Sequence, residues 1–138
     1  MIEQFVVDNS VVMSWCFKDE TNNYADTVLE KLTESAAVVP SIWSLEVVNV
    51  LLVAERQKRL SESDSIRFLT LLSQLPIVVE YEHPEMMKGL LALARSNNLS
   101  SYDASYLDLA MRNGFPIATL DKKLIEAAIR IDVPIFAA

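Results

Sequence analysis

The chain has 138 residues, 51% hydrophobic and 22% charged, so it is long enough for one packed domain and too apolar to be disordered. Its net charge of −7 argues against a nucleic-acid binder with an ordinary basic face. The same charge is compatible with clustered acids that hold divalent cations, and with a protein partner that is basic. A single cysteine, Cys16, excludes an intramolecular disulfide, and no apolar run reaches the roughly 18 residues of a membrane span. We therefore expect a cytoplasmic protein without a membrane segment.

The first predicted element is a buried strand, residues 1–8, that ends at a carboxylate. Phe5, Val6 and Val7 form a continuous apolar run, which is typical of a strand covered on both faces of a parallel sheet. Asp8 follows where the strand ends. Because ligands of open α/β sheets bind beyond the carboxyl ends of the strands, Asp8 is the first candidate for a functional residue.

Helices and strands alternate along the rest of the chain. We expect helices over residues 9–17, 22–35, 41–59, 61–74, 84–97, 100–113 and 121–131, and strands over residues 38–39, 76–81, 116–120 and 133–136. This alternation predicts one domain, residues 1–138, built as a three-layer α/β/α sandwich with a mostly parallel sheet of about five strands.

The third predicted helix carries an acid on an otherwise apolar segment. Over residues 42–54 its only polar side chains are Ser44, Glu46 and Asn49. Glu46 and Asn49 are three residues apart and share one face. A buried, unpaired carboxylate would be very costly, so Glu46 faces a polar cleft or a partner, unless this face is a solvated stripe.

Two further acids begin helices, and each has a structural explanation. Ser100 and Asp103 have the spacing of a capping box, which stabilises a helix start by itself. Asp121 follows the fourth strand and is placed to cap the last helix, as Asp8 is placed to cap the first. Capping does not explain why Asp8 and Asp121 both follow parallel strands, whose carboxyl ends lie on one edge of the sheet.

Four segments, taken in order, resemble the PIN-domain ribonucleases and, more narrowly, the VapC-type toxins of toxin–antitoxin pairs. They are Val6-Val7-Asp8-Asn9-Ser10, the run from Val39 to Asn49, the run from Leu99 to Leu107, and Ile117-Ala118-Thr119-Leu120-Asp121. Each motif is short, but the ordered set covers essentially the whole chain. The resemblance implies a PIN-like fold and a Mg²⁺- or Mn²⁺-dependent endoribonuclease. It also implies a homodimer that is inhibited by a cognate antitoxin, whose tail enters the active-site groove.

The resemblance also assigns roles to individual residues. The four acids of the family fall on Asp8, Glu46, Asp103 and Asp121. Asp8, Asp103 and Asp121 suit a hard cation, and Glu46 suits a general base or a water-mediated contact. The side chains expected to orient these acids are Ser10, Asn49 and Thr119.

The remaining expectations concern the substrate and the dimer. Lys122 and Lys123 adjoin Asp121 and are candidates for phosphate contact, or else ordinary surface charge. Lys123 stands where some relatives carry a further acid, which puts a second metal site in doubt. The third helix has more apolar residues than one core-facing side needs, and these residues, together with Val12 and Met13, suggest a dimer contact.

Two other classes of protein remain open. A receiver or phosphatase domain of similar layout also has an Asp after its first strand. Such a domain requires a second acid beside or two residues after that Asp, and this chain has Asn9 and Ser10 there. The second alternative is a catalytically inactive PIN-like module that only binds a protein partner.

Overall fold

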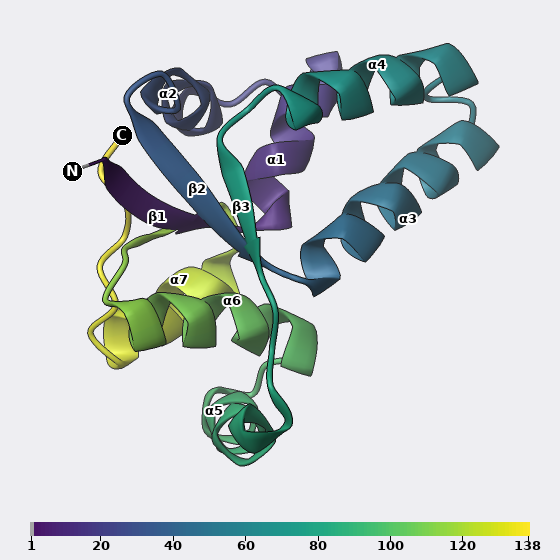
Figure 1. The fold of residues 1–138 in the computed structure, drawn as a ribbon. Helices are drawn as coiled ribbons and strands as arrows, with labels where there is room; N and C mark the ends of the chain where they lie inside the picture. Colours follow the sequence, from purple (N-terminus) through teal and green to yellow (C-terminus); the bar gives the residue numbers. More distant parts are fainter. Residues whose placement is uncertain (1) are drawn as a thin grey trace.

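Four parallel strands form the central sheet. The computed structural model describes residues 2–138, so Met1, which the strand prediction includes, lies outside the described residues. The strands are β1 (Glu3–Val7), β2 (Ser35–Pro40), β3 (Ile77–Glu80) and β4 (Ile117–Ala118), in the order β3-β2-β1-β4 (Figure 1). Successive crossovers run outward from β1 to β3, and the chain then returns to the other side of β1. The carboxyl ends of β1 and β4 therefore flank the topological switch point, where ligands bind in open α/β sheets.

Helices cover both faces of this sheet. They are α1 (Asn9–Cys16), α2 (Asn23–Lys31), α3 (Ile42–Arg56), α4 (Glu62–Ser73), α5 (Met87–Asn97), α6 (Ser101–Asn113) and α7 (Lys122–Arg130). In Figure 1, α1 and α2 lie above the sheet, α5, α6 and α7 lie below it, and the α3–α4 hairpin projects to the right. The predicted α/β/α sandwich with a parallel sheet is confirmed.

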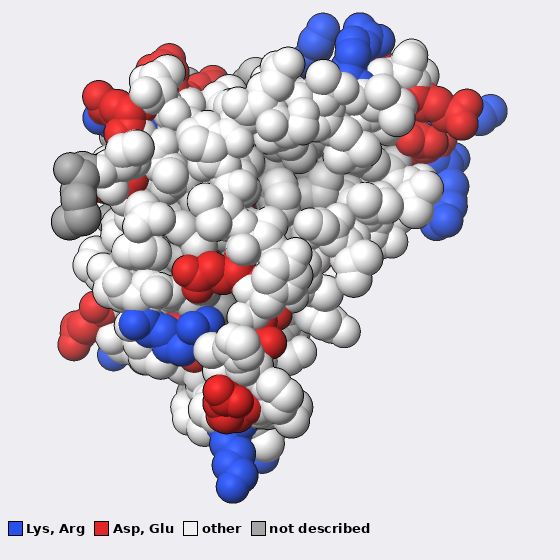
Figure 2. Space-filling view, viewed as in Figure 1, with Lys and Arg blue, Asp and Glu red and all other residues white. Residues whose placement is uncertain are grey.

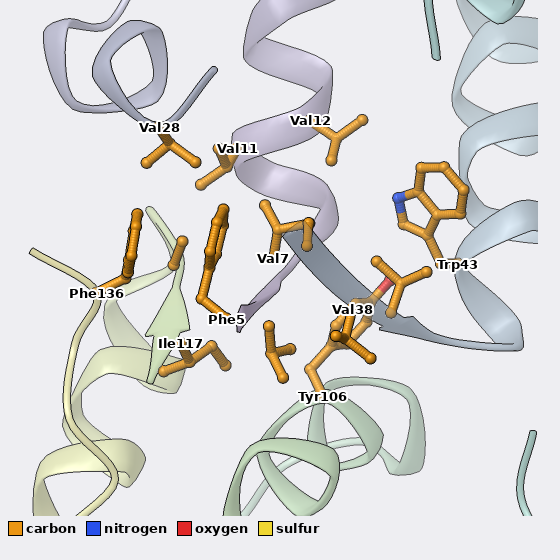
Figure 3. Close-up of a cluster of buried hydrophobic side chains, with 14 of the residues drawn as sticks. Phe5, Val7, Val11, Val12, Val28, Val38, Trp43, Tyr106, Ile117 and Phe136 are labelled. Carbon is orange, nitrogen blue, oxygen red and sulfur yellow. The ribbon is translucent and has the colours of Figure 1, made fainter. Parts of the chain in front are cut away.

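The core forms on both sides of β1. Phe5, Val6 and Val7 are fully buried, as the continuous apolar run predicted. The Phe5 ring stacks on Phe136 near the C-terminus, with ring centroids 4.0 Å apart. Figure 3 shows side chains of α1 on one side of β1 and Tyr106 of α6 on the other. The same packing fixes where β1 ends and therefore where Asp8 lies.

The expected fifth strand, residues 133–136, does not form. It makes only one isolated parallel bridge, between Ile117 and Ile135. β4 is itself reduced to two residues, and Pro134 has no backbone N–H to donate to a ladder. The sheet therefore has four strands, with the C-terminal segment attached to its edge by backbone bonds to Ile117.

The boundary between the second helix and β2 also differs from the prediction. α2 ends at Lys31, and β2 begins at Ser35, where Ser35 pairs with Glu3 of β1. Pairing with β1 thus makes Ser35 the start of a strand, although local propensity placed it at the end of a helix. Within residues 2–138, no helix combines the length and the apolar composition needed to cross a bilayer.

Candidate functional site

Asp8 is a buried carboxylate held by hydroxyl and backbone donors. It caps α1, with Oδ1 accepting from the backbone N–H groups of Ser10 at 3.1 Å and Val11 at 3.4 Å, and its side chain is almost inaccessible. The hydroxyls of Ser10 (2.5 Å) and Thr119 (2.6 Å) donate to its two oxygens. Burial raises the pKa of Asp8 to about 6, against the effect of these hydrogen bonds, and the charge of Asp121 adds to the rise.

The same two hydroxyls join the ends of β1 and β4. The Ser10 hydroxyl accepts from the backbone N–H of Leu120 at 2.9 Å, and the Thr119 hydroxyl accepts from that of Asp121 at 3.0 Å. Each hydroxyl therefore donates to Asp8 and accepts from the β4–α7 turn. Asp121 then caps α7 by accepting from the N–H of Leu124 at 3.2 Å. The structure brings Ser10 and Thr119 into contact with Asp8, as their predicted orienting role requires.

Glu46 is half-buried on α3 and accepts a hydrogen bond from the Tyr106 hydroxyl of α6 at 2.5 Å. Burial raises the pKa of Glu46, the Tyr106 bond lowers it, and the charge of Asp103 raises it. Tyr106 itself is buried. Tyr106 is not among the predicted site residues, although it lies three residues after Asp103 and on the same face of the helix. The contact joins residues 60 positions apart, so no local pattern indicated it.

Asp103 lies in the first turn of α6, and it does not complete the capping box that the spacing allowed. Ser100 accepts from the Asp103 N–H at 3.1 Å, but the Asp103 carboxylate accepts nothing from the Ser100 backbone. By contrast, Ser61 and Asp64 on α4 close both bonds of the box. Burial raises the pKa of Asp103, and the charge of Asp121 raises it further, while the Ser100 hydroxyl and Lys123 lower it.

These four acids therefore form one electrostatic group at the carboxyl edge of the sheet. The charge of Asp121 acts on Asp8 and Asp103, and that of Asp103 acts on Glu46. Among the described residues, none of the four forms an ion pair with Lys, Arg or His. Asp8, Glu46 and Asp103 have raised pKa values, and carboxylates of this kind that form no ion pair suit a hard divalent cation.

The four acids suit a cation by their chemistry and their position, but they do not form a ready-made set of ligands. Within residues 2–138, no three Asp, Glu, His or Cys side chains converge closely enough to hold a metal ion as they stand. Ion binding by three of these acids therefore requires their side chains to turn toward the ion. Mg²⁺ tolerates this arrangement because it keeps several waters and needs only one or two carboxylates directly.

Other predicted site residues lie apart from this group. Asn49 is exposed and, in the part of the chain described, its side chain makes no hydrogen bond to any of the acids. Lys122 and Lys123 are both exposed on the first turn of α7, where Lys123 acts electrostatically on Asp103. Asp108, also on α6, is buried and accepts a hydrogen bond from Nε of Arg112 at 2.8 Å.

Comparison with known sequences identifies relatives along most of the chain. The PIN domain family model matches residues 5–130. Ribonuclease VapC3 of Pyrobaculum aerophilum is 27% identical over 124 residues, which are 89% of this chain and 93% of that protein. The family-model match, residues 5–130, includes all four acids and the segments between them.

Comparison with solved structures finds the same architecture. PAE2754 of Pyrobaculum aerophilum aligns with a TM-score of 0.71 at 21% identity, over 92% of this chain and 87% of that chain. FitAcB of Neisseria gonorrhoeae aligns with a TM-score of 0.63 at 18% identity over 96% of both chains. A toxin–antitoxin complex from Klebsiella pneumoniae aligns with a TM-score of 0.61 at 17% identity, over 86% of this chain and 88% of that chain. At these identities the structural matches support the fold.

Proposed function

Because the chain belongs to the PIN domain family, we propose that it is a Mg²⁺- or Mn²⁺-dependent endoribonuclease and the toxin of a toxin–antitoxin pair. The observation that carries the proposal is the group of four interacting acids without a positive partner at the switch point of the sheet. The single cysteine and the function of the relative favour the cytoplasm.

In this proposal Asp8, Asp103 and Asp121 hold the ion. The chemistry that the ion supplies when bound is charge stabilisation at the phosphate and a lowered pKa for the attacking water. Glu46 accepts the proton of that water, since its raised pKa brings a carboxylate closer to the range of an effective base. Ser10 and Thr119 fix both oxygens of Asp8, so Asp103 and Asp121 are the acids whose side chains would turn toward the ion.

The direct test is cleavage of RNA by the purified protein. We expect cutting with Mg²⁺ or Mn²⁺ and none with EDTA, and no cutting by Asp8→Ala or Glu46→Ala. Cutting that persists in EDTA would reject the metal-dependent mechanism. Folded, metal-loaded protein that cuts no RNA would instead favour a module that only binds its partner.

An antitoxin partner follows from the same charge distribution. Acids that form no ion pair within residues 2–138 suit a basic peptide tail that enters the site, and the overall charge of −7 favours its approach. The corresponding measurement is inhibition of cleavage by the partner. Excess RNA should relieve this inhibition if the tail occupies the site, and inhibition independent of RNA concentration would place the partner elsewhere.

A homodimer is proposed from an exposed apolar face. Figure 2 shows a broad uncharged surface between the upper part of β3 and the α3–α4 hairpin, with charged side chains at its lower border and at the free end of the hairpin. The large apolar residues exposed on these elements are Leu45, Val48, Leu52, Val53, Ile66, Leu69, Leu71 and Val78. Such a patch, beside the open edge of β3, suits a second copy of the chain. Val12 and Met13 are buried within the chain, so the expectation that they form the contact is wrong.

Sedimentation equilibrium tests this dimer. The wild-type chain should sediment as a dimer at micromolar concentration, and Val48→Asp should sediment as a monomer because it places a charge on the apolar face. Ile129→Asp introduces the same charge at an exposed apolar position of α7 and should remain dimeric. A wild-type monomer, or equal behaviour of both variants, would contradict the proposed interface.

Removal of the Tyr106 hydroxyl tests whether the position of Glu46 matters. Tyr106→Phe should lower kcat by about 10-fold with little change in KM, because small misplacements of a reacting group are costly. Tyr24→Phe is a matched control, since Tyr24 donates one hydroxyl bond to the carbonyl of Phe136 at 2.8 Å. It should lose a similar amount of stability but keep its kcat. An unaltered kcat in folded Tyr106→Phe would show that this contact is structural only.

A further inference from the structure

A polar pocket of about 210 Å³ lies between the C-terminal end of α5 and α7. Its lining residues, which we call the α5–α7 pocket, are Asn97, Asn98, Lys123, Glu126 and Arg130. Lys123 and Arg130 are seven residues apart on α7, which is two helical turns, so they project from one face. Neither forms an ion pair within residues 2–138.

Arg130 is held in place by a buried side chain. Asn97 is 9% exposed, donates to the carbonyl of Leu93 at 3.0 Å, and accepts from Nε of Arg130 at 3.3 Å. This contact uses only one donor of the guanidinium, so the terminal N–H groups remain for another acceptor. Anchoring also reduces the side-chain entropy that Arg130 would lose when it binds a ligand.

The pocket adjoins the proposed active site. Lys123 follows Asp121 by two residues, and its charge lowers the pKa of Asp103. Asn98 ends α5, and only Leu99 and Ser100 separate it from the helix that carries Asp103. The pocket therefore lies where a strand bound at the acids can extend past Lys123.

The charge of the lining suits a single phosphodiester. Two cations and Glu126 leave a net charge of +1, and the amide of Asn98 adds a neutral donor. We propose that the α5–α7 pocket binds a phosphodiester of the RNA strand next to the one that is cut. This inference rests on the proposed function, and it gives an acidic protein a local means of holding RNA.

The salt dependence of RNA binding tests this assignment. Binding of a single-stranded RNA oligonucleotide should be measured by fluorescence anisotropy in an Asp8→Asn background with Mg²⁺, so that turnover does not interfere. Lys123→Gln and Arg130→Gln together should reduce the slope of log K against log[salt] by about 0.7, the value for one phosphate contact on a single strand, and each alone should remove part of it. In the Asp8-containing enzyme Arg130→Gln should raise KM with kcat unchanged.

Two further variants separate a binding role from a structural one. Glu126→Gln removes the negative charge of the pocket and should tighten RNA binding, which a folding defect would not do. Lys31→Gln removes a charge beside the amino end of β2, where the Lys31 carbonyl accepts from Ser35, and should change neither slope nor KM. Lys123 is exposed, so Lys123→Gln keeps the test valid if Arg130→Gln proves unstable.

The outcomes distinguish this inference from the proposed function. RNA cleavage by wild-type protein, with slopes and KM of the pocket variants equal to those of Lys31→Gln, overturns the pocket alone. Absence of cleavage, with reduced slopes for Lys123→Gln and Arg130→Gln, overturns the nuclease and supports the pocket. Binding of inorganic phosphate that depends on Arg130, without any change in the RNA slopes, would assign the pocket to free phosphate and also overturn the inference.

Discussion

Glu46→Gln is expected to lower kcat for RNA cleavage by about 10²–10⁴-fold, the range that a positioned general base contributes. Glutamine keeps the shape of the side chain and still accepts the Tyr106 bond, but it has no carboxylate to take the proton of the attacking water. Steady-state cleavage at saturating Mg²⁺ measures the effect, which should fall on kcat rather than KM.

The matched control for Glu46→Gln lies on the same helix. Glu55 is also half-buried on α3 and also accepts a hydroxyl bond, from Ser65 at 2.6 Å, but it lies more than two turns away from Glu46. Glu55→Gln should therefore keep full activity. Retention of kcat by Glu46→Gln, or an equal loss in both variants, would remove Glu46 from the mechanism.

Asp8→Asn is expected to lower cleavage by about 100-fold or more and, at the same time, to stabilise the metal-free protein above pH 6. Activity should fall because the amide removes the negative charge of the most buried carboxylate that would hold the proposed ion. Stability rises because the wild-type carboxylate is desolvated, and its pKa is raised from 3.8 to about 6. A pKa shift of this size corresponds to a gain of about 3 kcal/mol in the free energy of unfolding. The gain is smaller to the extent that the Ser10 and Thr119 hydroxyls bond an amide less strongly than a carboxylate.

The pH dependence of this effect has a definite sign. Between about pH 4 and pH 6 the folded state binds the Asp8 proton and the unfolded state does not, so the free energy of unfolding falls as pH rises. The destabilisation caused by ionised, buried Asp8 is complete above pH 6 and absent below pH 4. Urea unfolding of metal-free protein at pH 4, 5, 6 and 7.5 measures it, and Asp8→Asn should lose this part of the pH dependence.

Asp64→Asn provides a control of opposite sign. The Ser61 N–H and hydroxyl hold the pKa of Asp64 below its usual range, so that carboxylate stabilises the fold when ionised. Asp64→Asn should therefore destabilise the protein at neutral pH and keep full cleavage. Loss of stability in Asp8→Asn at pH 7.5, or its full activity, would contradict the role assigned to Asp8.

Much of the candidate site was predictable because local signals and one topological rule placed it. The apolar run before Asp8 marks a buried strand, and the same reasoning places Asp121 after β4, because parallel strands share one carboxyl edge. Glu46 stood out as the one acid in the apolar stretch over residues 42–54. Asp103 was harder to assign, since its spacing from Ser100 matched an ordinary capping box, and only the structure shows that box left incomplete.

The sequence by itself determined most of the elements and which acids follow them, because helix caps and strand periodicity are properties of short segments. Whether residues 133–136 form a strand depended instead on pairing with β4. Only the tertiary structure decided that Tyr106 reaches Glu46, that Thr119 bonds Asp8, and that Asn49 faces solvent. These outcomes depend on how each helix is rotated against the sheet. That rotation is set by packing among residues far apart in the chain, so no local pattern encodes it.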